Sequence, residues 1–538
     1  MELLELSDKR ILIVDDLPEM RSIMRGMMES LGGQHFVLAK DGNEAINALA
    51  KKYFDIVICD YNLGEGKDGQ QILEEARHRN IFRSSAVFIM VTAENTAQMV
   101  MGALEFQPDA YLSKPVNKKV LMSRLEKLIS KKASLRDVYD AMDNEQYDVV
   151  LNLVEEGLVS NPKNAFELLR LKSAVQLALG DYDEVIALTE KVLGDREILW
   201  AMFDNARAQF HSQQYSDSLE MLLKLTKFNG EFIAAYDWIA KIYEIQGDYG
   251  NAQKILQVAI NKSPKSVTRQ RALATVAEKN NDSEVAIRAR KKSVSVGKGS
   301  ILREASDYTN LAKSLVDNGS TKDVLHVINS MKSEFKDEPK SHLESMVGLS
   351  SVYERMGNAK ASEEALTASL NLAKKNPQLV TQEMSKEIAS SCLKNGKSEE
   401  ATAFIEDVIR SNHENTTLLN EISDMYREAG LEEQGQELIK KTKGEIIKIN
   451  NQGVSLIKEG KLDESIKLFS KAAEGMPRNP VINLNLAHSL IMQMKKSKPS
   501  RISMDKVMTY MNAARDSEAH HAWVKKLMNE SRKLRQML

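Results

Sequence analysis

The chain has 538 residues, and its charges nearly cancel, with 74 Lys and Arg against 76 Asp and Glu. This balance gives no bulk attraction to nucleic acid or to an anionic membrane. With only 26 glycines and 10 prolines, the chain lacks the turn residues that an all-β protein needs. Its two cysteines, Cys59 and Cys392, are too few and too far apart to indicate a disulfide framework or a metal site.

The amino terminus and the apolar runs bear on localisation. The first residues include Glu2, Glu5 and Asp8, which is the wrong charge for a signal peptide. The most apolar run, Ser84 to Ala93, is too short to cross a bilayer. We therefore expect a cytoplasmic protein with no membrane partner.

Residues 9–132 alternate short β-branched runs with amphipathic stretches. The runs show little alternation of apolar and polar residues, which is typical of parallel strands buried on both faces. The predicted strands are Ile11–Val14, Phe36–Ala39, Ile56–Cys59, Val87–Val91 and Ala110–Ser113. The predicted helices are Glu19–Leu31, Asn43–Lys51, Gln70–Arg79, Ala97–Phe106 and Asn117–Lys131. These five units predict a doubly wound α/β domain over residues 1–132, with a five-stranded parallel sheet and ligands at the carboxyl ends of the strands.

After residue 132 the strand pattern ends and a period of about 34 residues begins. Tyr147, Tyr182, Tyr215 and Tyr249 recur at spacings of 35, 33 and 34. Turn glycines continue the series less regularly at Gly319, Gly357, Gly396, Gly430 and Gly460. This period resembles the tetratricopeptide repeat (TPR), and it predicts an all-α superhelix of about ten helix pairs over residues 133–538. The expected function of its inner groove is to bind a protein partner.

Polar residues stand where the predicted strands end. Asp15 and Asp16 follow the first strand, and Asp60, Thr92 and Lys114 come at the ends of the third, fourth and fifth. Each alone has an ordinary structural explanation, such as favouring a helix N-terminus. Together, three carboxylates at one sheet edge call for a cation, and an all-oxygen set suits Mg²⁺. With a hydroxyl and an ammonium beside them, the sequence predicts a carboxylate that accepts a phosphoryl group.

This arrangement resembles the receiver domain of two-component response regulators. The resemblance covers residues 8–132 and rests on five segments in the same order. These segments are Ile11–Asp16, Ala39–Gly42, Ile56–Asp60, Val91–Ala93 and Tyr111–Pro115. It implies a phosphorelay signalling protein whose partner is a histidine kinase or a phosphotransfer protein.

The resemblance also assigns roles to individual residues. It implies that Asp60 is the phosphoacceptor and that the side chains of Asp15, Asp16 and Asp60, with the backbone carbonyl of Asn62, hold Mg²⁺. Thr92 and Lys114 would bind the phosphoryl group, and Thr92 and Tyr111 would form the conformational switch. Asn62 and Glu94 would tune autodephosphorylation, as in fast-cycling chemotaxis receivers. We expect no enzymatic activity beyond this self-phosphorylation and dephosphorylation.

One segment departs from the family pattern. Asp68-Gly69 stands eight residues after Asp60 where the family has seven, and the usual Met-Pro after the acceptor is absent. The loop is therefore one residue longer than usual and has no proline.

The junction between the two regions is expected to be stiff, because Val116 to Glu156 contains neither glycine nor proline. The alternative is a short break near Lys131–Ser134. Phosphorylation would alter the face formed by the last two receiver helices and the fifth strand. That face would contact the repeat array or form a homodimer, and either route would change partner access to the groove.

A second hypothesis assigns the array to RNA or DNA. Basic clusters occur at Arg288–Lys292 and at Lys495–Arg501. Neither cluster has interleaved aromatic residues, and a solvated helix face explains both. Nucleic acid is therefore the less favoured partner.

Overall fold

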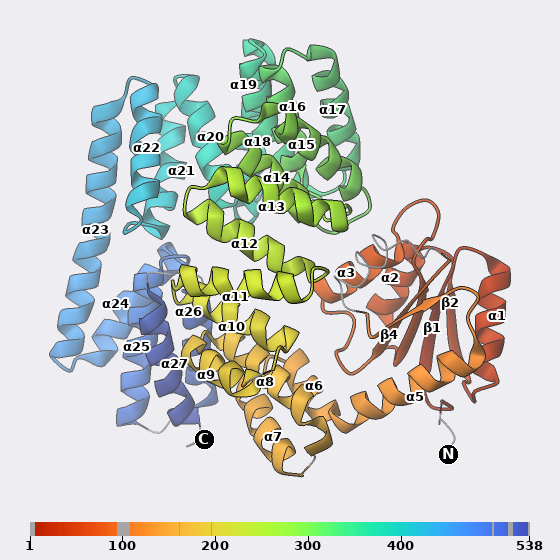
Figure 1. The fold of residues 1–538 in the computed structure, drawn as a ribbon. Helices are drawn as coiled ribbons and strands as arrows, with labels where there is room; N and C mark the ends of the chain where they lie inside the picture. Colours follow the sequence, from red (N-terminus) through yellow and green to blue (C-terminus); the bar gives the residue numbers. More distant parts are fainter. Residues whose placement is uncertain are drawn as a thin grey trace. The chain divides into compact units, whose positions relative to one another are not determined.

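The structure is a computed structural model that describes residues 6–93, 108–160, 162–194, 196–497, 500–514 and 520–535. The chain divides into two compact units, Met1–Asp307 and Tyr308–Leu538. Figure 1 shows an α/β domain at the amino terminus, and every labelled element after it is a helix. The predicted helix Ala97–Phe106 lies outside the described residues.

The α/β domain contains one parallel sheet with the strand order β2-β1-β3-β4-β5. The strands are β1 (Arg10–Val14), β2 (His35–Ala39), β3 (Ile56–Asp60), β4 (Val87–Thr92) and β5 (Ala110–Ser113). In the register, Ile13 pairs with Ile58, and Asp60 pairs with Val91. All five strands were predicted to within one residue at each end, and the doubly wound parallel sheet is confirmed.

Helices cover both faces of this sheet. They are α1 (Pro18–Glu29), α2 (Gly42–Lys51), α3 (Gly69–His78) and α5 (Lys118–Ser134). One buried cluster joins Leu12 and Val57 to residues of α2 and α3. The other joins Ile11 and Ile58 to Leu121 and its neighbours on α1 and α5. Alternate residues of a strand thus face opposite cores, which explains why the strands lack polar alternation.

The domain continues into the helical array with a break of one residue. Leu135 ends α5 and precedes α6 (Arg136–Asp143), and its side chain is buried. Its φ of −120° and ψ of 14° interrupt the helix without a flexible linker. The predicted domain boundary at residue 132 therefore falls inside α5.

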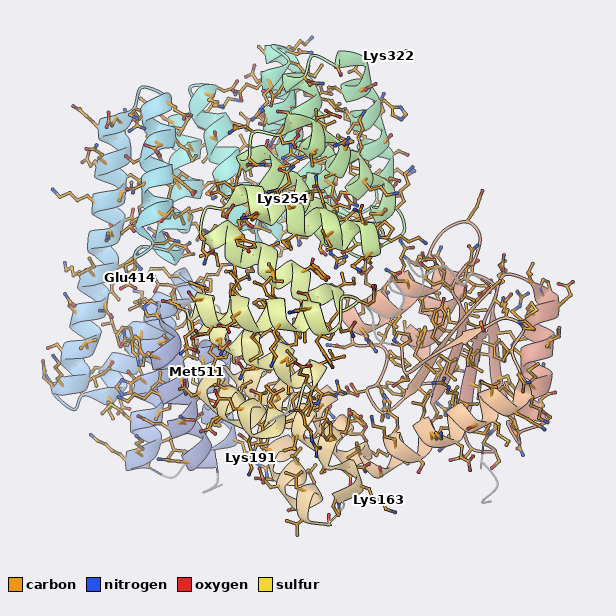
Figure 2. The ribbon with its side chains drawn as sticks, in the orientation of Figure 1. Lys163, Lys191, Lys254, Lys322, Glu414 and Met511 are labelled. Atoms are coloured by element: carbon orange, nitrogen blue, oxygen red, sulfur yellow. The ribbon has the colours of Figure 1, made fainter. Side chains whose placement is uncertain are left out.

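The first unit also contains helices α7 to α15. These are α7 (Tyr147–Ser160), α8 (Ala165–Leu179), α9 (Tyr182–Leu193), α10 (Leu199–His211), α11 (Tyr215–Phe228), α12 (Ile233–Ile245), α13 (Tyr249–Lys262), α14 (Val267–Lys279) and α15 (Ser283–Gly297). The four periodic tyrosines are the first residues of α7, α9, α11 and α13. The array is thus built from helix pairs with the predicted period. Some of its charged side chains, among them Lys163, Lys191 and Lys254, are exposed (Figure 2).

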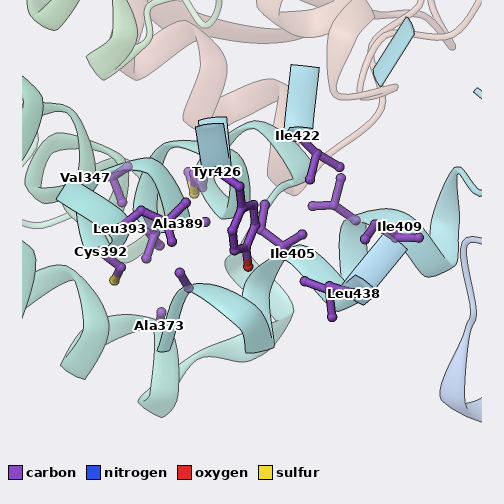
Figure 3. Packing of buried hydrophobic residues seen from close by; sticks show 14 of the residues in the cluster. Val347, Ala373, Ala389, Cys392, Leu393, Ile405, Ile409, Ile422, Tyr426 and Leu438 are labelled. Atoms are coloured by element: carbon purple, nitrogen blue, oxygen red, sulfur yellow. The ribbon is translucent and has the colours of Figure 1, made fainter. Parts of the chain in front are cut away.

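The helices of the second unit continue the array. They are α16 (Ala305–Asp317, which spans the unit boundary), α17 (Thr321–Glu334), α18 (Pro339–Arg355), α19 (Ala359–Lys375), α20 (Gln382–Lys394), α21 (Ser398–Ser411), α22 (Thr416–Glu428), α23 (Glu432–Lys458), α24 (Leu462–Gly475), α25 (Pro480–Lys496), α26 (Arg501–Ala513) and α27 (His521–Arg535). The turn glycines predicted from Gly319 to Gly460 all have positive φ, between 70° and 78°. Tyr426 is buried in the hydrophobic core between helices (Figure 3).

The helical content raises the question of membrane insertion. Within the described part of the chain, no helix combines the length and the apolarity that crossing a bilayer requires.

Candidate functional site

The predicted site residues meet at the carboxyl edge of the sheet. Asp15 directly follows β1, and Asp60 and Thr92 are the last residues of β3 and β4. Lys114 directly follows β5, and its backbone N–H donates to the carbonyl of Thr92. Because β1, β3, β4 and β5 are neighbours in the sheet, their ends form one continuous rim.

Lys114 joins two of the carboxylates. Its Nζ donates to Oδ2 of Asp15 and to Oδ2 of Asp60, each at 2.8 Å. Both aspartates are buried, with 6% and 7% of their surface exposed. Burial makes these charge-assisted hydrogen bonds stronger than they would be in water, and it makes their loss costly.

Burial and the ion pairs act in opposite directions on the protonation of these groups. Burial raises the pKa of Asp60 above its ordinary value, and the hydrogen bond from Lys114 partly offsets that rise. For Lys114, burial lowers the pKa, but the bonds to Asp15 and Asp60 outweigh it, so the pKa lies above its ordinary value. Lys114 is therefore a fixed positive charge at neutral pH.

The three carboxylates fit a divalent cation. One ligand oxygen from each of Asp15, Asp16 and Asp60 lies within 4.8 Å of the others. Three carboxylates face a single ammonium group, so an excess of negative charge remains for a cation. An all-oxygen donor set with one exposed member, Asp16, suits Mg²⁺, which keeps several of its waters.

The structure describes all but one of the remaining predicted residues. Thr92 is 1% exposed, and Tyr111 is half-buried against the core formed with α2 and α3. Asn62 is two residues beyond the acceptor, and its backbone N–H bonds to Asp60. Glu94 lies outside the described residues.

Sequence reasoning missed the residue that supports the acidic pair. Arg21, on α1, donates from Nη1 to the carbonyl oxygens of Asp15 (2.6 Å) and Asp16 (3.1 Å). The backbone N–H of Leu17 also donates to Oδ1 of Asp15. These bonds hold the turn after β1, and because Arg21 bonds to backbone carbonyls, no pattern of side-chain types in the sequence indicates its role.

The loop that departs from the family pattern joins β3 to α3. Tyr61, at its start, donates its N–H to Val91, and its carbonyl accepts from Gly69 at the loop's end. Between them Gly64 and Gly66 have φ of 71° and 101°, conformations that favour glycine. Asp68 caps α3 through a reciprocal pair of hydrogen bonds with Gln71. The two glycines thus accommodate the extra residue. Hydrogen bonds at Tyr61 and Asp68 fix the two ends of the loop.

A parallel five-stranded sheet with an acidic cluster and a lysine at its carboxyl edge defines a receiver domain. Residues 11–126 match the family described as the response regulator receiver domain. The chain belongs to this family through that domain.

Two chemotaxis proteins that this chain resembles agree with this assignment. The chemotaxis protein CheY-3 of Vibrio cholerae serotype O1 is 30% identical over 131 residues, which are 24% of this chain and 99% of that protein. The chemotaxis protein CheY of Pseudomonas aeruginosa is 31% identical over 122 residues, which are 23% and 97%. A solved CheY-like receiver domain protein from Methanospirillum hungatei JF-1 is 26% identical with a TM-score of 0.22, covering 23% of this chain and 96% of that one. The similarity to these proteins covers about a quarter of this chain.

Proposed function

We propose that this protein is a phosphorylation-controlled adaptor: Asp60 accepts a phosphoryl group, and the state of the receiver controls the binding of a partner protein by the helical array. The observation that carries this proposal is the position of Asp60. It is buried, bonded to Lys114 and grouped with Asp15 and Asp16 at the rim of a receiver sheet.

The chemistry follows from the groups at this rim. The donor is a phosphohistidine of a kinase or phosphotransfer protein, and its P–N bond breaks as a carboxylate oxygen of Asp60 bonds to phosphorus. Mg²⁺, held by Asp15, Asp16, Asp60 and the Asn62 carbonyl, would offset the negative charge of the phosphoryl oxygens. Lys114 donates to one of those oxygens, which replaces part of its present pairing with carboxylates. Thr92 donates its hydroxyl to another, and Tyr111 follows it inward.

The array is proposed to be of the TPR type and to bind protein. The support is that the four periodic tyrosines each begin a helix and that the predicted turn glycines have left-handed backbone conformations. Stacked helix pairs of this kind form extended concave surfaces, which are suited to peptide segments or helices of a partner. No further catalytic activity is proposed for the array.

The test separates phosphoryl transfer from partner binding. The full chain is incubated with acetyl phosphate and Mg²⁺, and phosphorylation is followed by intact mass. We expect one added phosphoryl group on the wild type and none on Asp60→Asn. Affinity capture with each form then reports the partner, and a partner retained equally by both forms would exclude control by the receiver.

The nucleic-acid hypothesis is less well supported because basic residues in the clusters are paired. Arg288 pairs with Glu284 and Arg290 with Glu278. In the second cluster Lys495 pairs with Glu530, while Lys498 lies outside the described residues. Retention of the full chain on RNA or DNA that falls steeply with salt would favour this hypothesis instead.

A homodimer through the receiver is the other route that the sequence suggested. Light scattering measures the mass of the full chain with and without beryllium fluoride, a phosphoryl mimic. This measurement distinguishes dimerisation from a contact between the receiver and the array of the same chain. We expect a monomer in both states, and a dimer only with the mimic would support the other route.

A further inference from the structure

Two interhelical loops of the array, separated by the pair of helices α14 and α15, contact the receiver loop that follows the phosphoacceptor. The first loop joins α13 to α14 and contains Lys265. The second joins α15 to α16 and contains Lys298, Gly299 and Ser300. We name these four residues the array clasp. The receiver residues that they contact begin with Tyr61, the residue after Asp60.

Lys265 makes the contact nearest the phosphoacceptor. Its Nζ lies 3.0 Å from Oδ2 of Asp68, at the far end of the receiver loop. The same ammonium stands 4.8 Å from the centre of the Tyr61 ring, within the range of a cation–π interaction. Tyr61 is 2% exposed. One array residue therefore connects both pinned ends of the loop that carries Asn62.

The second loop of the clasp acts mainly through its backbone. Lys67 donates from Nζ to the carbonyl of Gly299 at 2.7 Å, and Gln71 donates from Nε2 to the carbonyl of Lys298 at 3.1 Å. Ser300 donates its hydroxyl to Oε2 of Glu74 at 2.8 Å. These bonds hold the carboxyl half of the receiver loop and the first two turns of α3.

Gly299 suits this position because of its backbone conformation and its closeness to the receiver loop. Its φ is +80°, and a Cβ there would lie 3.3 Å from Oε1 of Gln71 and 3.5 Å from the carbonyl oxygen of Gly66. A side chain at 299 would strain its own backbone and crowd the receiver loop. The shape of the second array loop is thus matched to the receiver loop.

The sequence of the contacted loop places few restraints on its backbone conformation. It has one residue more than the family pattern, no proline, and glycines at 64 and 66. Each of these features increases the number of backbone conformations that must be lost when the loop is ordered. The contacts from the array clasp therefore supply conformational restraint that the sequence of the loop does not.

We propose that Lys265 and the rest of the array clasp are positioning residues of the phosphorylation site, and that they hold the loop so that the carbonyl of Asn62 is presented to Mg²⁺. The array then contributes residues to the phosphorylation site in addition to binding a partner. This inference rests on the function proposed for Asp60. By linkage, a clasp that strengthens Mg²⁺ binding is itself strengthened when Mg²⁺ and a phosphoryl group bind. The array thereby senses the state of Asp60 through the β3–α3 loop.

The first test measures Mg²⁺ affinity of the full chain by isothermal titration calorimetry, with Mg²⁺ alone as the probe. Lys265→Ala is expected to weaken Mg²⁺ binding by about tenfold, the lower end of the effect that outer-shell residues have on metal affinity. Lys265→Arg, which keeps the ion pair and the cation–π contact, should restore most of the affinity. Lys254→Ala, an exposed lysine on α13, is the matched control and should bind as the wild type does.

Gly299→Ala provides a second variant that disturbs the clasp from the other loop, and it should weaken Mg²⁺ binding in the same direction. A cooperative thermal unfolding transition confirms that each variant is folded. Wild-type Mg²⁺ affinity in both Lys265→Ala and Gly299→Ala would overturn the inference.

The second test is hydrogen–deuterium exchange of the full chain with and without Mg²⁺ and beryllium fluoride. We expect slower exchange in peptides that contain Lys265 and Gly299 when the mimic binds. Unchanged exchange in both peptides, with the mimic bound at Asp60, would contradict the inference. If the wild type accepts no phosphoryl group, the proposed function fails, and the Mg²⁺ titration still decides the role of the clasp separately.

Discussion

The ammonium nitrogen of Lys114 lies 2.8 Å from Oδ2 of Asp60, although 54 positions separate the two residues. Their strands, β5 and β3, are not neighbours, since β4 lies between them. The lysine side chain therefore reaches over the end of β4, where Thr92 stands. This contact places a positive charge directly on the acceptor before any phosphoryl group arrives.

Replacement of Lys114 is expected to impair phosphoryl acceptance. In Lys114→Met the phosphoryl oxygens lose a donor, and Asp15 and Asp60 face each other without a shared cation. We expect phosphorylation by acetyl phosphate to slow by about 100- to 1000-fold, as for the loss of one transition-state donor. Intact mass over a time course measures the rate. Lys119→Met, at an exposed lysine of α5, should leave it unchanged, and an equal loss in that control would contradict the assignment.

Mg²⁺ is expected to stabilise the receiver. It binds the folded acidic cluster and not the unfolded chain, so at ten times its Kd it should add about 1.4 kcal/mol to the free energy of unfolding. Scanning calorimetry with MgCl₂, against NaCl at equal ionic strength, measures this rise. Asp16→Asn removes one ligand of the cluster. The rise should shrink in that variant, and a rise of full size there would argue against the metal site.

Two glycines of α23 should respond in opposite ways to alanine. A Cβ at Gly453 would overlap the ring of Phe469, which is fully buried, whereas a Cβ at Gly444 would meet nothing within 4 Å. Gly453→Ala should lower the free energy of unfolding by about 1–3 kcal/mol through overpacking. Gly444→Ala should raise it by about 0.5–1 kcal/mol because alanine loses less backbone entropy in a helix. Urea denaturation followed by circular dichroism measures both.

The control for this pair is a smaller partner at 469. Phe469→Leu in the Gly453→Ala background should recover part of the lost stability, since it makes room for the added methyl group. If the double variant loses as much free energy of unfolding as the two single variants together, the overlap with Phe469 is not the cause of the loss in Gly453→Ala.

Glu167 should make the receiver–array junction sensitive to acid. It lies on α8 and bonds to Lys131 of α5 and to Tyr139 of α6, and it pairs with Arg170. Burial by itself would raise its pKa, but the hydrogen bonds and charges of Arg170 and Lys131 lower the pKa to about 2. A pKa lowered on folding stabilises the folded state above the ordinary pKa near 4.5, and this contribution is lost as the pH falls toward 2.

Glu167→Gln tests this predicted loss of stability at low pH. At pH 7 it should lower the free energy of unfolding by about 1–2 kcal/mol, less than the full shift implies because the side chain is partly solvated. The difference from wild type should narrow between about pH 5 and pH 3. Urea denaturation across this range measures it, and a difference that is constant with pH would exclude the ion pairs as its source.

Much of the fold was predictable because its signals are local. Buried parallel strands need continuous apolar runs, so their bounds could be found from composition alone. Tyr147 and Tyr182 mark helix starts because each repeat uses the same turn, and Gly180 ends α8 in a left-handed conformation that glycine favours. The site residues were predictable for a related reason: in a parallel sheet, polar residues that follow strands must meet at one edge.

The partners of those residues required the structure. The sequence placed Lys114 at the correct edge, but only the packing of β3, β4 and β5 shows that one ammonium bridges Asp15 and Asp60. Arg21 was missed because its contacts are with backbone carbonyls, which leave no pattern of side-chain types.

The sequence alone was enough to predict a receiver with an acidic site, a junction almost without interruption and an array of helix pairs, since strands, helix starts and the polar residues that follow strands can each be identified from short segments of the chain. It predicted coupling through the last two receiver helices and the fifth strand. In the structure α5 does contact the array, where Lys131 meets Glu167, but the β3–α3 loop is contacted as well. Lys265 and Asp68 are 197 positions apart, and their contact depends on the path of the intervening helices. Small rotations at each helix pair add up along that path, so only the tertiary structure could decide which array loops reach the phosphorylation site.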